Sequence, residues 1–244
     1  MNSLAYRLYA TVLAFGLIVF SSTINTKANP LTVIELFTSQ GCSSCPPADE
    51  YLAELSEDPS VLALTLPVDY WDYLGWRDTN GRKEHTQRQY LYAKTLKKRS
   101  VYTPQIVVNG VADAVGSDRR NVQSLINTVA PFSVPVSVHQ NANTYIASIG
   151  AGDVPDGTMV AVWLVFFDKK SRVNIPRGEN SGKKIAYHNV VRSMRMISVW
   201  EGKALKLTIA KSDVMRAGTD SCAIIVQSEK DGRLGPIVGA ALLI

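Results

Sequence analysis

Two cysteines separated by two serines follow a short apolar stretch and are followed at once by two prolines. Residues 31–38 form a nearly continuous apolar run, and Cys42 and Cys45 come shortly after it. Proline lacks a backbone N–H, so Pro46 and Pro47 fit a helix only within its first turn. The pattern therefore predicts a strand that leads both cysteines, one turn apart, to the start of a helix. There, unpaired backbone N–H groups and the helix dipole stabilise a thiolate, the species that attacks disulfides.

The C-x-x-C motif has three interpretations. Half of a zinc site would need a second pair of ligands, and the three histidines are scattered along the chain: His85, His139 and His188. The pair could also form an inert structural disulfide. The redox interpretation is favoured because the motif follows a predicted strand and opens a predicted helix. Cys42 is then the attacking thiolate at the exposed helix entrance, and Cys45 is the more buried thiol that resolves the mixed disulfide.

A redox dithiol carries electrons itself, so this interpretation predicts neither an organic cofactor nor a metal. The third cysteine, Cys222, lies far from the motif and precedes an apolar run. We expect it to be a small buried hydrophobic residue, with a regulatory or intermolecular thiol as the alternative.

The N-terminus resembles a secretory signal peptide. Arg7 provides a positive charge, residues 10–20 form an apolar run, and Thr26 and Ala28 stand at the −3 and −1 positions of a cleavage site. The apolar run is shorter than the ~20 residues that a membrane span needs. We therefore predict a signal peptide over residues 1–28 and a periplasmic or secreted protein without stable membrane insertion after cleavage. An uncleaved N-terminal anchor is the alternative.

The composition favours a globular protein. Hydrophobic residues make up 46% of the 244 residues and charged residues 19%, which suits a folded core. The net charge of +5 is spread along the chain without a dense basic run. This distribution argues against a nucleic-acid partner.

The periodicity predicts two kinds of structure on either side of residue 133. Before it, strands and helices alternate in the order β-α-β-α-β-β-α, with predicted strands at 31–38, 61–69, 105–109 and 111–115, and helices at 45–56, 82–99 and after Ser117 or Asp118. After it come seven strand-like stretches separated by turns: 134–139, 144–149, 159–167, 184–191, 205–209, 223–227 and 237–243. Short strands at this spacing are typical of a β-sandwich.

The segment LFTSQGCSSC resembles the strand and C-x-x-C segment of thioredoxins and glutaredoxins, and Thr103-Pro104 resembles their cis-proline loop. The resemblance implies an α/β thioredoxin-like domain over residues 29–132, followed by an all-β sandwich-like domain over residues 133–244. It implies that Thr103 and Pro104 contact the substrate backbone. A carboxyl group in this part of thioredoxin accepts the proton of the second cysteine, which makes Glu35 a candidate base; alternatively Glu35 is solvated at a strand edge.

Several segments also resemble a family of secreted bacterial proteins with a thioredoxin-like domain and no assigned function. They cover nearly the whole mature chain: VIELFTSQGCSSCPPAD, VDYWDYLGWRD, VYTPQIVVNG and IPRGENSGKKIAYHNVVR. The sequence departs from ordinary thioredoxins in having Gln40-Gly41 before the first cysteine and Ser43-Ser44 between the two. These differences put electron transfer to the usual thioredoxin partners in doubt.

Two further stretches carry groups that could bind a substrate. Tyr70, Trp71 and Trp76 lie in an aromatic loop that forms either a substrate-binding surface or a buried junction between the two halves. Residues 177–180, with His188, make up the densest polar stretch of the second half and could face the C-x-x-C motif.

Together these features predict an exported thiol–disulfide oxidoreductase that acts on a protein or small-molecule thiol or disulfide. The identity of its redox partner is not predicted. The alternative is a periplasmic binding or assembly module in which the two cysteines form a stabilising disulfide.

Overall fold

The computed structural model describes residues 32–243, so the predicted signal peptide over residues 1–28 lies outside the described residues. The first half of the chain forms β1 (Thr32–Thr38), α1 (Pro46–Leu55), β2 (Val61–Pro67), the short 3₁₀ helix η1 (Asp72–Leu74), α2 (Lys83–Thr95), β3 (Gln105–Val108), β4 (Ala112–Val115) and α3 (Arg119–Thr128). The second half forms β5 (Val136–Gln140), β6 (Thr144–Ile149), β7 (Met159–Asn174), β8 (Lys184–Val199), β9 (Leu205–Ala210), α4 (Lys211–Arg216), β10 (Ser221–Lys230) and β11 (Arg233–Leu242).

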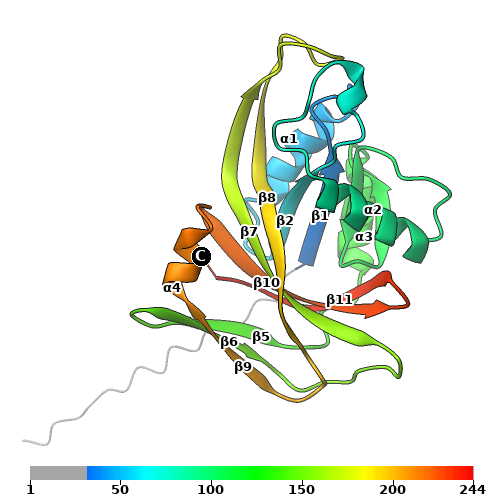
Figure 1. Ribbon diagram of the computed structural model, residues 1–244. Coiled ribbons are helices and arrows are strands. Elements are labelled where there is room, and N and C mark those ends of the chain that lie inside the picture. Colours follow the sequence, from blue (N-terminus) through cyan, green and yellow to red (C-terminus); the bar gives the residue numbers. More distant parts are fainter. Residues whose placement is uncertain (1–31, 244) are drawn as a thin grey trace, which may run out of the picture.

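A single mixed sheet runs through both halves of the chain (Figure 1). It has eight strands in the order β11-β10-β7-β8-β2-β1-β3-β4, and a second sheet has three strands in the order β5-β6-β9. Strands β1 and β2 are parallel, as the β-α-β start requires. The two halves join where β2 pairs in parallel with β8, with Thr65 opposite Val190.

The predicted fold class is therefore wrong. The chain is mostly β, and its second half does not close into a separate sandwich but adds β7, β8, β10 and β11 to the sheet of the first half. The reason is the length of β7 and β8, which have 16 residues each. The continuous apolar run stops at Phe167, but backbone pairing continues through residues 168–174, which are polar except for Val173. The division near residue 133 stays a prediction.

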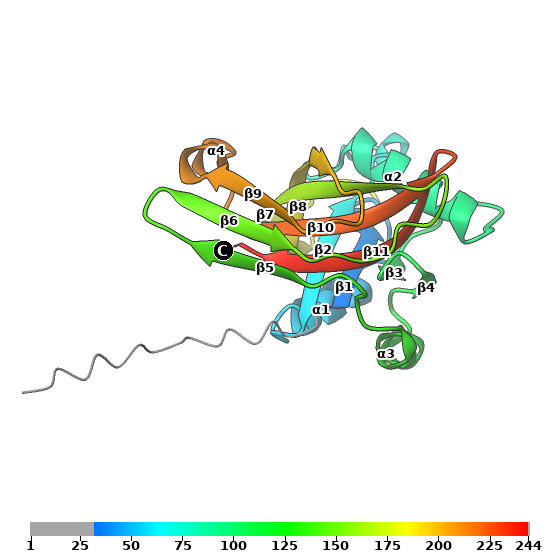
Figure 2. The same ribbon diagram turned by 90° about the horizontal axis from the view of Figure 1, so that it is seen from below.

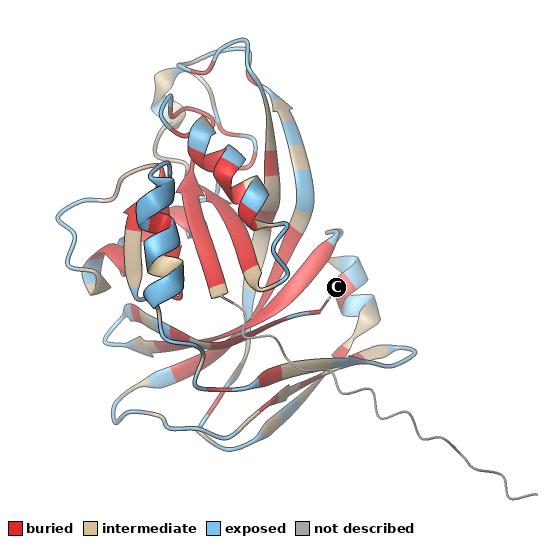
Figure 3. Ribbon diagram, turned by 180° about the vertical axis from the view of Figure 1, so that it is seen from behind, coloured by how far each residue is buried: buried red, intermediate tan, exposed pale blue. Residues whose placement is uncertain are grey.

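Strands β1, β2 and β3 are buried on both faces, because helices cover each side, whereas β4 is only partly buried (Figure 3). Helices α1 and α3 pack on one face, where Ile34 and Leu36 of β1 point. Val33 and Phe37 of β1 point to the other face, toward Tyr92 of α2. Alternate residues of β1 thus serve two different cores.

A third core lies between the three-stranded sheet and strands β7, β10 and β11 (Figure 2). Trp200 and Cys222 are among its buried side chains. The prediction of a buried Cys222 is confirmed, and burial raises the pKa of its thiol to about 12. None of the helices in the described part of the chain has the length and hydrophobicity that a membrane crossing needs.

Candidate functional site

A disulfide joins Cys42 and Cys45 at the start of α1, with their Cα atoms 5.4 Å apart. Cys45 is the N-cap residue, and the two prolines occupy the first helical positions as the sequence predicts. The carbonyl of Cys45 accepts hydrogen bonds from the N–H groups of Ala48, at 2.8 Å, and of Asp49, at 3.1 Å. The two sulfurs therefore lie at the positive end of the helix dipole.

Cys42 is much less exposed than the sequence predicts, whereas Cys45 is the more buried of the two, as predicted. Cys42 is 3% exposed and Cys45 is fully buried. The exposed part of the motif consists of Ser43 and Ser44, and the Ser44 hydroxyl lies 3.4 Å from the Cys42 sulfur.

The loop before Cys42 is held by the aromatic segment. The indole N–H of Trp76 donates to the side-chain carbonyl of Gln40 at 2.8 Å, and the Gln40 backbone N–H donates to Asp78 at 2.7 Å. Trp71 packs against Gly41, where an added Cβ would lie 3.0 Å from the Cβ of Trp71. These aromatic side chains thus shape the entrance to the disulfide.

Trp71 also connects the C-x-x-C loop with the second predicted substrate contact. Its indole N–H donates to the Thr103 hydroxyl at 2.8 Å. The Thr103–Pro104 peptide bond is cis, and the Pro104 carbonyl accepts from Gly116 at 2.9 Å. Trp71, Trp76 and Tyr70 are partly buried, whereas Tyr73 is 77% exposed. The aromatic loop therefore packs inward along most of its length and presents one ring to solvent, and its binding of a substrate stays a prediction.

The tip of the β7–β8 hairpin reaches the C-x-x-C loop from the other half of the chain. The Asn180 side-chain amide donates to the carbonyls of Gln40, at 3.0 Å, and of Cys42, at 2.8 Å. The neighbouring Glu179 carboxylate accepts from the backbone N–H of Ser43 at 3.1 Å. The expectation that the polar stretch 177–180 faces the motif is therefore confirmed.

His188 does not join this group. It lines a cavity with Glu57 and Lys170, beyond the C-terminal end of α1, whereas the disulfide lies at the helix start. Its backbone carbonyl accepts from the Thr65 hydroxyl at 2.6 Å. Partial burial and the charge of Lys170 lower the pKa of its imidazole.

Glu35 points to the opposite side of β1 from α1. The Arg88 guanidinium of α2 donates to its two carboxylate oxygens, at 2.6 and 3.1 Å, and the Tyr92 hydroxyl donates to the second oxygen. Gln227 of β10 completes the group by accepting from Arg88 at 2.7 Å. This placement does not bring Glu35 to Cys45, so the geometry does not support its predicted role as a base.

Asp49 is the buried acid on the side of the disulfide. It lies four residues after Cys45, so both occupy the same face of α1, and helical side chains lean toward the N-terminus. It is 3% exposed, and its carboxyl oxygens have no hydrogen-bond partner among the described residues; the same is true of the Thr38 and Tyr187 hydroxyls. Burial raises the pKa of Asp49 well above its usual value, the nearby Thr38 hydroxyl offsets part of this effect, and Asp78 adds to it.

Sequence reasoning did not single out Asp49. An acid in the first helical turn looks like an ordinary partner of the helix dipole. The signal was its spacing of four from Cys45, but the sequence does not show that α1 packs against β8, which contributes Tyr187. Burial, followed by the charges of Asp49 and Asp78, raises the pKa of Tyr187, which marks the three groups as neighbours.

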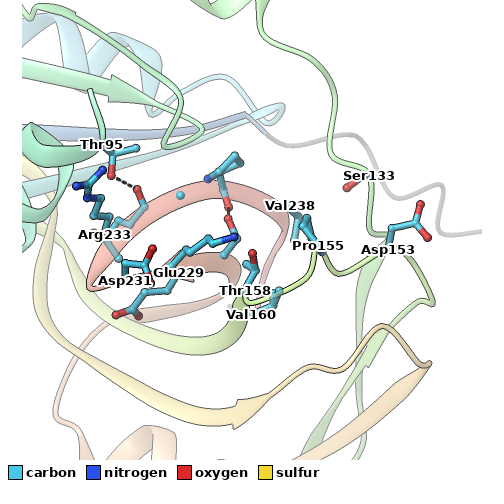
Figure 4. A pocket seen from close by; sticks show the side chains of 15 residues that line it. Thr95, Ser133, Asp153, Pro155, Thr158, Val160, Glu229, Asp231, Arg233 and Val238 are labelled. Carbon is cyan, nitrogen blue, oxygen red and sulfur yellow. Dashed lines mark hydrogen bonds between the residues drawn. The ribbon is translucent and has the colours of Figure 1, made fainter. Parts of the chain in front are cut away.

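The described residues also include a cavity that lies away from the disulfide. In residues 32–243 no group of three or more histidines, cysteines or acids is placed to hold a metal ion. A cavity of about 490 Å³ lies where the β10–β11 turn, with Glu229 and Arg233, meets residues 153–160 (Figure 4). Neither disulfide cysteine lines it, so the site rests on the disulfide and its surroundings.

Comparison with known proteins places this architecture in a family. A family model described as "Protein of unknown function (DUF1223)" matches residues 33–227. The chain belongs to this family. The crystal structure of protein AGR_C_4864 from Agrobacterium tumefaciens is 34% identical, covers 87% of this chain and 93% of that chain, and has a TM-score of 0.76.

A more distant likeness concerns the fold alone. HBP35 of Porphyromonas gingivalis is 12% identical, covers 88% of this chain and 74% of that chain, and has a TM-score of 0.55. No curated protein matches the chain.

Proposed function

We propose that this member of the DUF1223 family is a thiol–disulfide oxidoreductase whose redox group is the Cys42–Cys45 pair. The observation that carries the proposal is the disulfide itself, which sits at the N-cap of α1 behind two exposed serines. A helix start stabilises the thiolate that forms when the pair is reduced.

In the reducing direction, the Cys42 thiolate attacks one sulfur of a substrate disulfide. The substrate S–S bond breaks, a mixed disulfide forms, and the released substrate thiolate takes up a proton. The Cys45 thiol then loses its proton and its sulfur attacks the Cys42 sulfur. The second substrate thiolate leaves, so two electrons have passed to the substrate and the Cys42–Cys45 disulfide is restored. An external dithiol reduces the pair again, and the oxidising direction is the reverse.

Asp49 is the group that takes the Cys45 proton in this scheme. It replaces Glu35 in that role because it shares a helix face with Cys45 and has no cation beside it, whereas the Glu35 oxygens bind Arg88. A carboxyl group whose pKa burial has raised is a better base near neutral pH than an ordinary aspartate.

Substrates reach the pair over Ser43 and Ser44. Trp71 and Thr103 lie on one side of this path, and the tip of the β7–β8 hairpin lies on the other. We assign Thr103 and Pro104 to substrate contact and Tyr70, Trp71 and Trp76 to the walls of the entrance. The substrate is a protein or small-molecule disulfide. The signal-like N-terminus supports work outside the cytoplasm, where disulfides persist; N-terminal sequencing of the exported protein should then begin at residue 29.

Equilibration of the mature protein with dithiol and disulfide buffers tests the proposal. We expect one reversible two-electron couple, and we expect Cys45→Ser to accumulate a mixed disulfide on Cys42. Cys222→Ala is the matched control, because this third cysteine is buried in another core and should leave the couple unchanged. A disulfide that no dithiol reduces in the folded protein, or a Cys42→Ser variant with wild-type exchange, would rule the function out.

The burial of both sulfurs favours a second candidate, a binding or assembly module that the disulfide stabilises. Melting curves separate the two. The module predicts a large loss of stability on reduction without exchange activity, because a disulfide acts mainly by restricting the unfolded chain. The oxidoreductase predicts exchange activity and a reduced form that remains folded.

A further inference from the structure

We propose that Glu179, at the tip of the β7–β8 hairpin, restrains the reactivity of Cys42 near neutral pH by holding its carboxylate charge against the backbone N–H of Ser43. The second half of the chain would then set the reactivity of a redox pair that the first half carries. This inference rests on the proposed function, but the experiment that tests it measures only the reactivity of Cys42 and does not require that function.

The Ser43 amide is the first N–H after Cys42, and it lies in the turn that leads into α1. Free N–H groups in such a turn stabilise an adjacent thiolate. The Glu179 carboxylate accepts this N–H at 3.1 Å. It therefore removes one donor from the neighbourhood of the sulfur and adds a negative charge to it.

Buried contacts hold the hairpin tip in this place. Asn180, next to Glu179, is fully buried and uses its amide to bind the carbonyls of Gln40 and Cys42. Lys183 donates to the Asn180 side-chain oxygen at 2.8 Å, which fixes the orientation of the amide. Each polar atom of the Asn180 side chain thus has a partner, and Glu179 is presented to Ser43 by an anchored residue.

The consequence has a definite sign. A nearby negative charge disfavours the thiolate, whereas the neutral thiol is little affected. Glu179 should therefore raise the pKa of the reduced Cys42 thiol and decrease its thiolate fraction near neutral pH. It also makes the reduced pair easier to oxidise wherever the thiolate is populated. Movement of the hairpin tip away from the motif would increase the reactivity of Cys42.

The test is the pH dependence of iodoacetamide alkylation in a mature chain that carries Cys45→Ser. Cys42 then reacts alone, because the remaining cysteine is buried and its pKa is raised to about 12. Adding Glu179→Gln keeps an acceptor for the Ser43 N–H but removes the charge. We expect the acid dissociation constant of Cys42 to increase about two- to fivefold, the range for exposed charge pairs.

Salt provides a readout that a structural role would not move. The screening length falls from ~8 Å at 0.15 M to ~3 Å at 1 M ionic strength. The difference between the chain that keeps Glu179 and the chain with Glu179→Gln should therefore shrink in high salt. The matched control is Glu201→Gln, which changes an exposed glutamate in the segment that follows β8. It should leave the Cys42 profile unchanged.

Three results would overturn the inference: an unchanged profile for Glu179→Gln, an equal shift for Glu201→Gln, or a shift that persists in high salt. The outcome is separable from the proposed function. If the wild-type protein shows no reversible couple but Glu179→Gln still shifts the Cys42 profile, the function fails and this inference stands. If the couple exists and the profile does not move, the inference fails alone.

Discussion

Two groups of buried polar residues flank β1, one on each face, and they differ in how they are satisfied. On the side of α2, Glu35, Arg88, Tyr92 and Gln227 form what we call the paired cluster. On the side of α1, Thr38, Asp49 and Tyr187 form the unpaired cluster, whose side-chain oxygens have no hydrogen-bond partner among the described residues. Each cluster holds one buried acid, but only one of the two has a cation beside it.

The contrast indicates different purposes. The paired cluster joins β1 and α2 to β10 and therefore helps to fix the two halves of the chain together. Although burial works against its charge, the neighbouring Glu35 carboxylate raises the pKa of Arg88. The unpaired cluster costs stability, since a buried polar group without a partner is unfavourable. Such a cost is commonly found at functional sites, and this one lies beside Cys45.

The largest effect is expected from breaking the paired cluster. Arg88→Met removes the cation but leaves Glu35 buried, which should lower the free energy of unfolding by about 3–5 kcal/mol. Urea unfolding of the mature protein measures it. Arg119→Met is the control, because it breaks the exposed ion pair with Glu54 and should change stability little. A loss from Arg88→Met as small as that of the control would contradict the structural role of the paired cluster.

The unpaired cluster should respond in the opposite direction. Asp49→Asn should raise the free energy of unfolding at pH 8 by about 1–3 kcal/mol, because it removes the cost of keeping an ionisable acid in an unpaired buried site above its unfolded pKa. The sign follows from the raised pKa of Asp49: the folded state prefers the protonated acid, so the penalty is absent below the unfolded pKa of ~3.9 and grows as the pH rises to the folded pKa.

Urea unfolding between pH 4 and pH 8 checks this pH dependence. Asp113→Asn is the matched control, because the Asp113 carboxylate is nearly buried but is bound by Lys98 at 2.8 Å and by Tyr102 at 2.7 Å. Removing this paired charge should destabilise the protein. An advantage of Asp49→Asn that does not grow with pH would show that the carboxyl is not an uncompensated acid.

The two clusters also mark how far the sequence can be interpreted without the structure. Local patterns predict most of the helices and strands, the prolines at the start of α1 and an N-cap at Ser117 or Asp118, of which Asp118 accepts from Asn121. They do not predict α4 or the full length of β7 and β8. The two faces of β1 could not be told apart, because apolar residues occupy both sides of Glu35. Its partner Arg88 lies 53 residues away, and that distance hides the pairing.

The arrangement around the disulfide depends on contacts between residues that are even farther apart in the sequence. Asn180 binds carbonyls 138 and 140 residues away, and it can do so only because β7 and β8 continue beyond their apolar halves. The second half of β7 carries no apolar period, because backbone pairing with β8 continues there and is joined by polar side-chain contacts such as that between Ser171 and Asn80. The sequence therefore indicates where polar residues are concentrated, but the register of the long β7–β8 hairpin determines which residues they contact.

The smallest expected effect is that of Tyr187→Phe, which together with Tyr92→Phe tests the comparison at the level of single hydroxyl groups. Tyr187→Phe removes a hydroxyl that has no partner among the described residues, so we expect stability to be unchanged or to rise by up to about 1 kcal/mol. Tyr92→Phe removes a hydroxyl that contacts Glu35, Arg88 and Gln227, so stability should fall by about 1–3 kcal/mol. Thermal and urea unfolding of both variants measures the difference. Equal losses would mean that the Tyr187 hydroxyl is as well satisfied in solution as that of Tyr92, and the distinction between the clusters would then disappear.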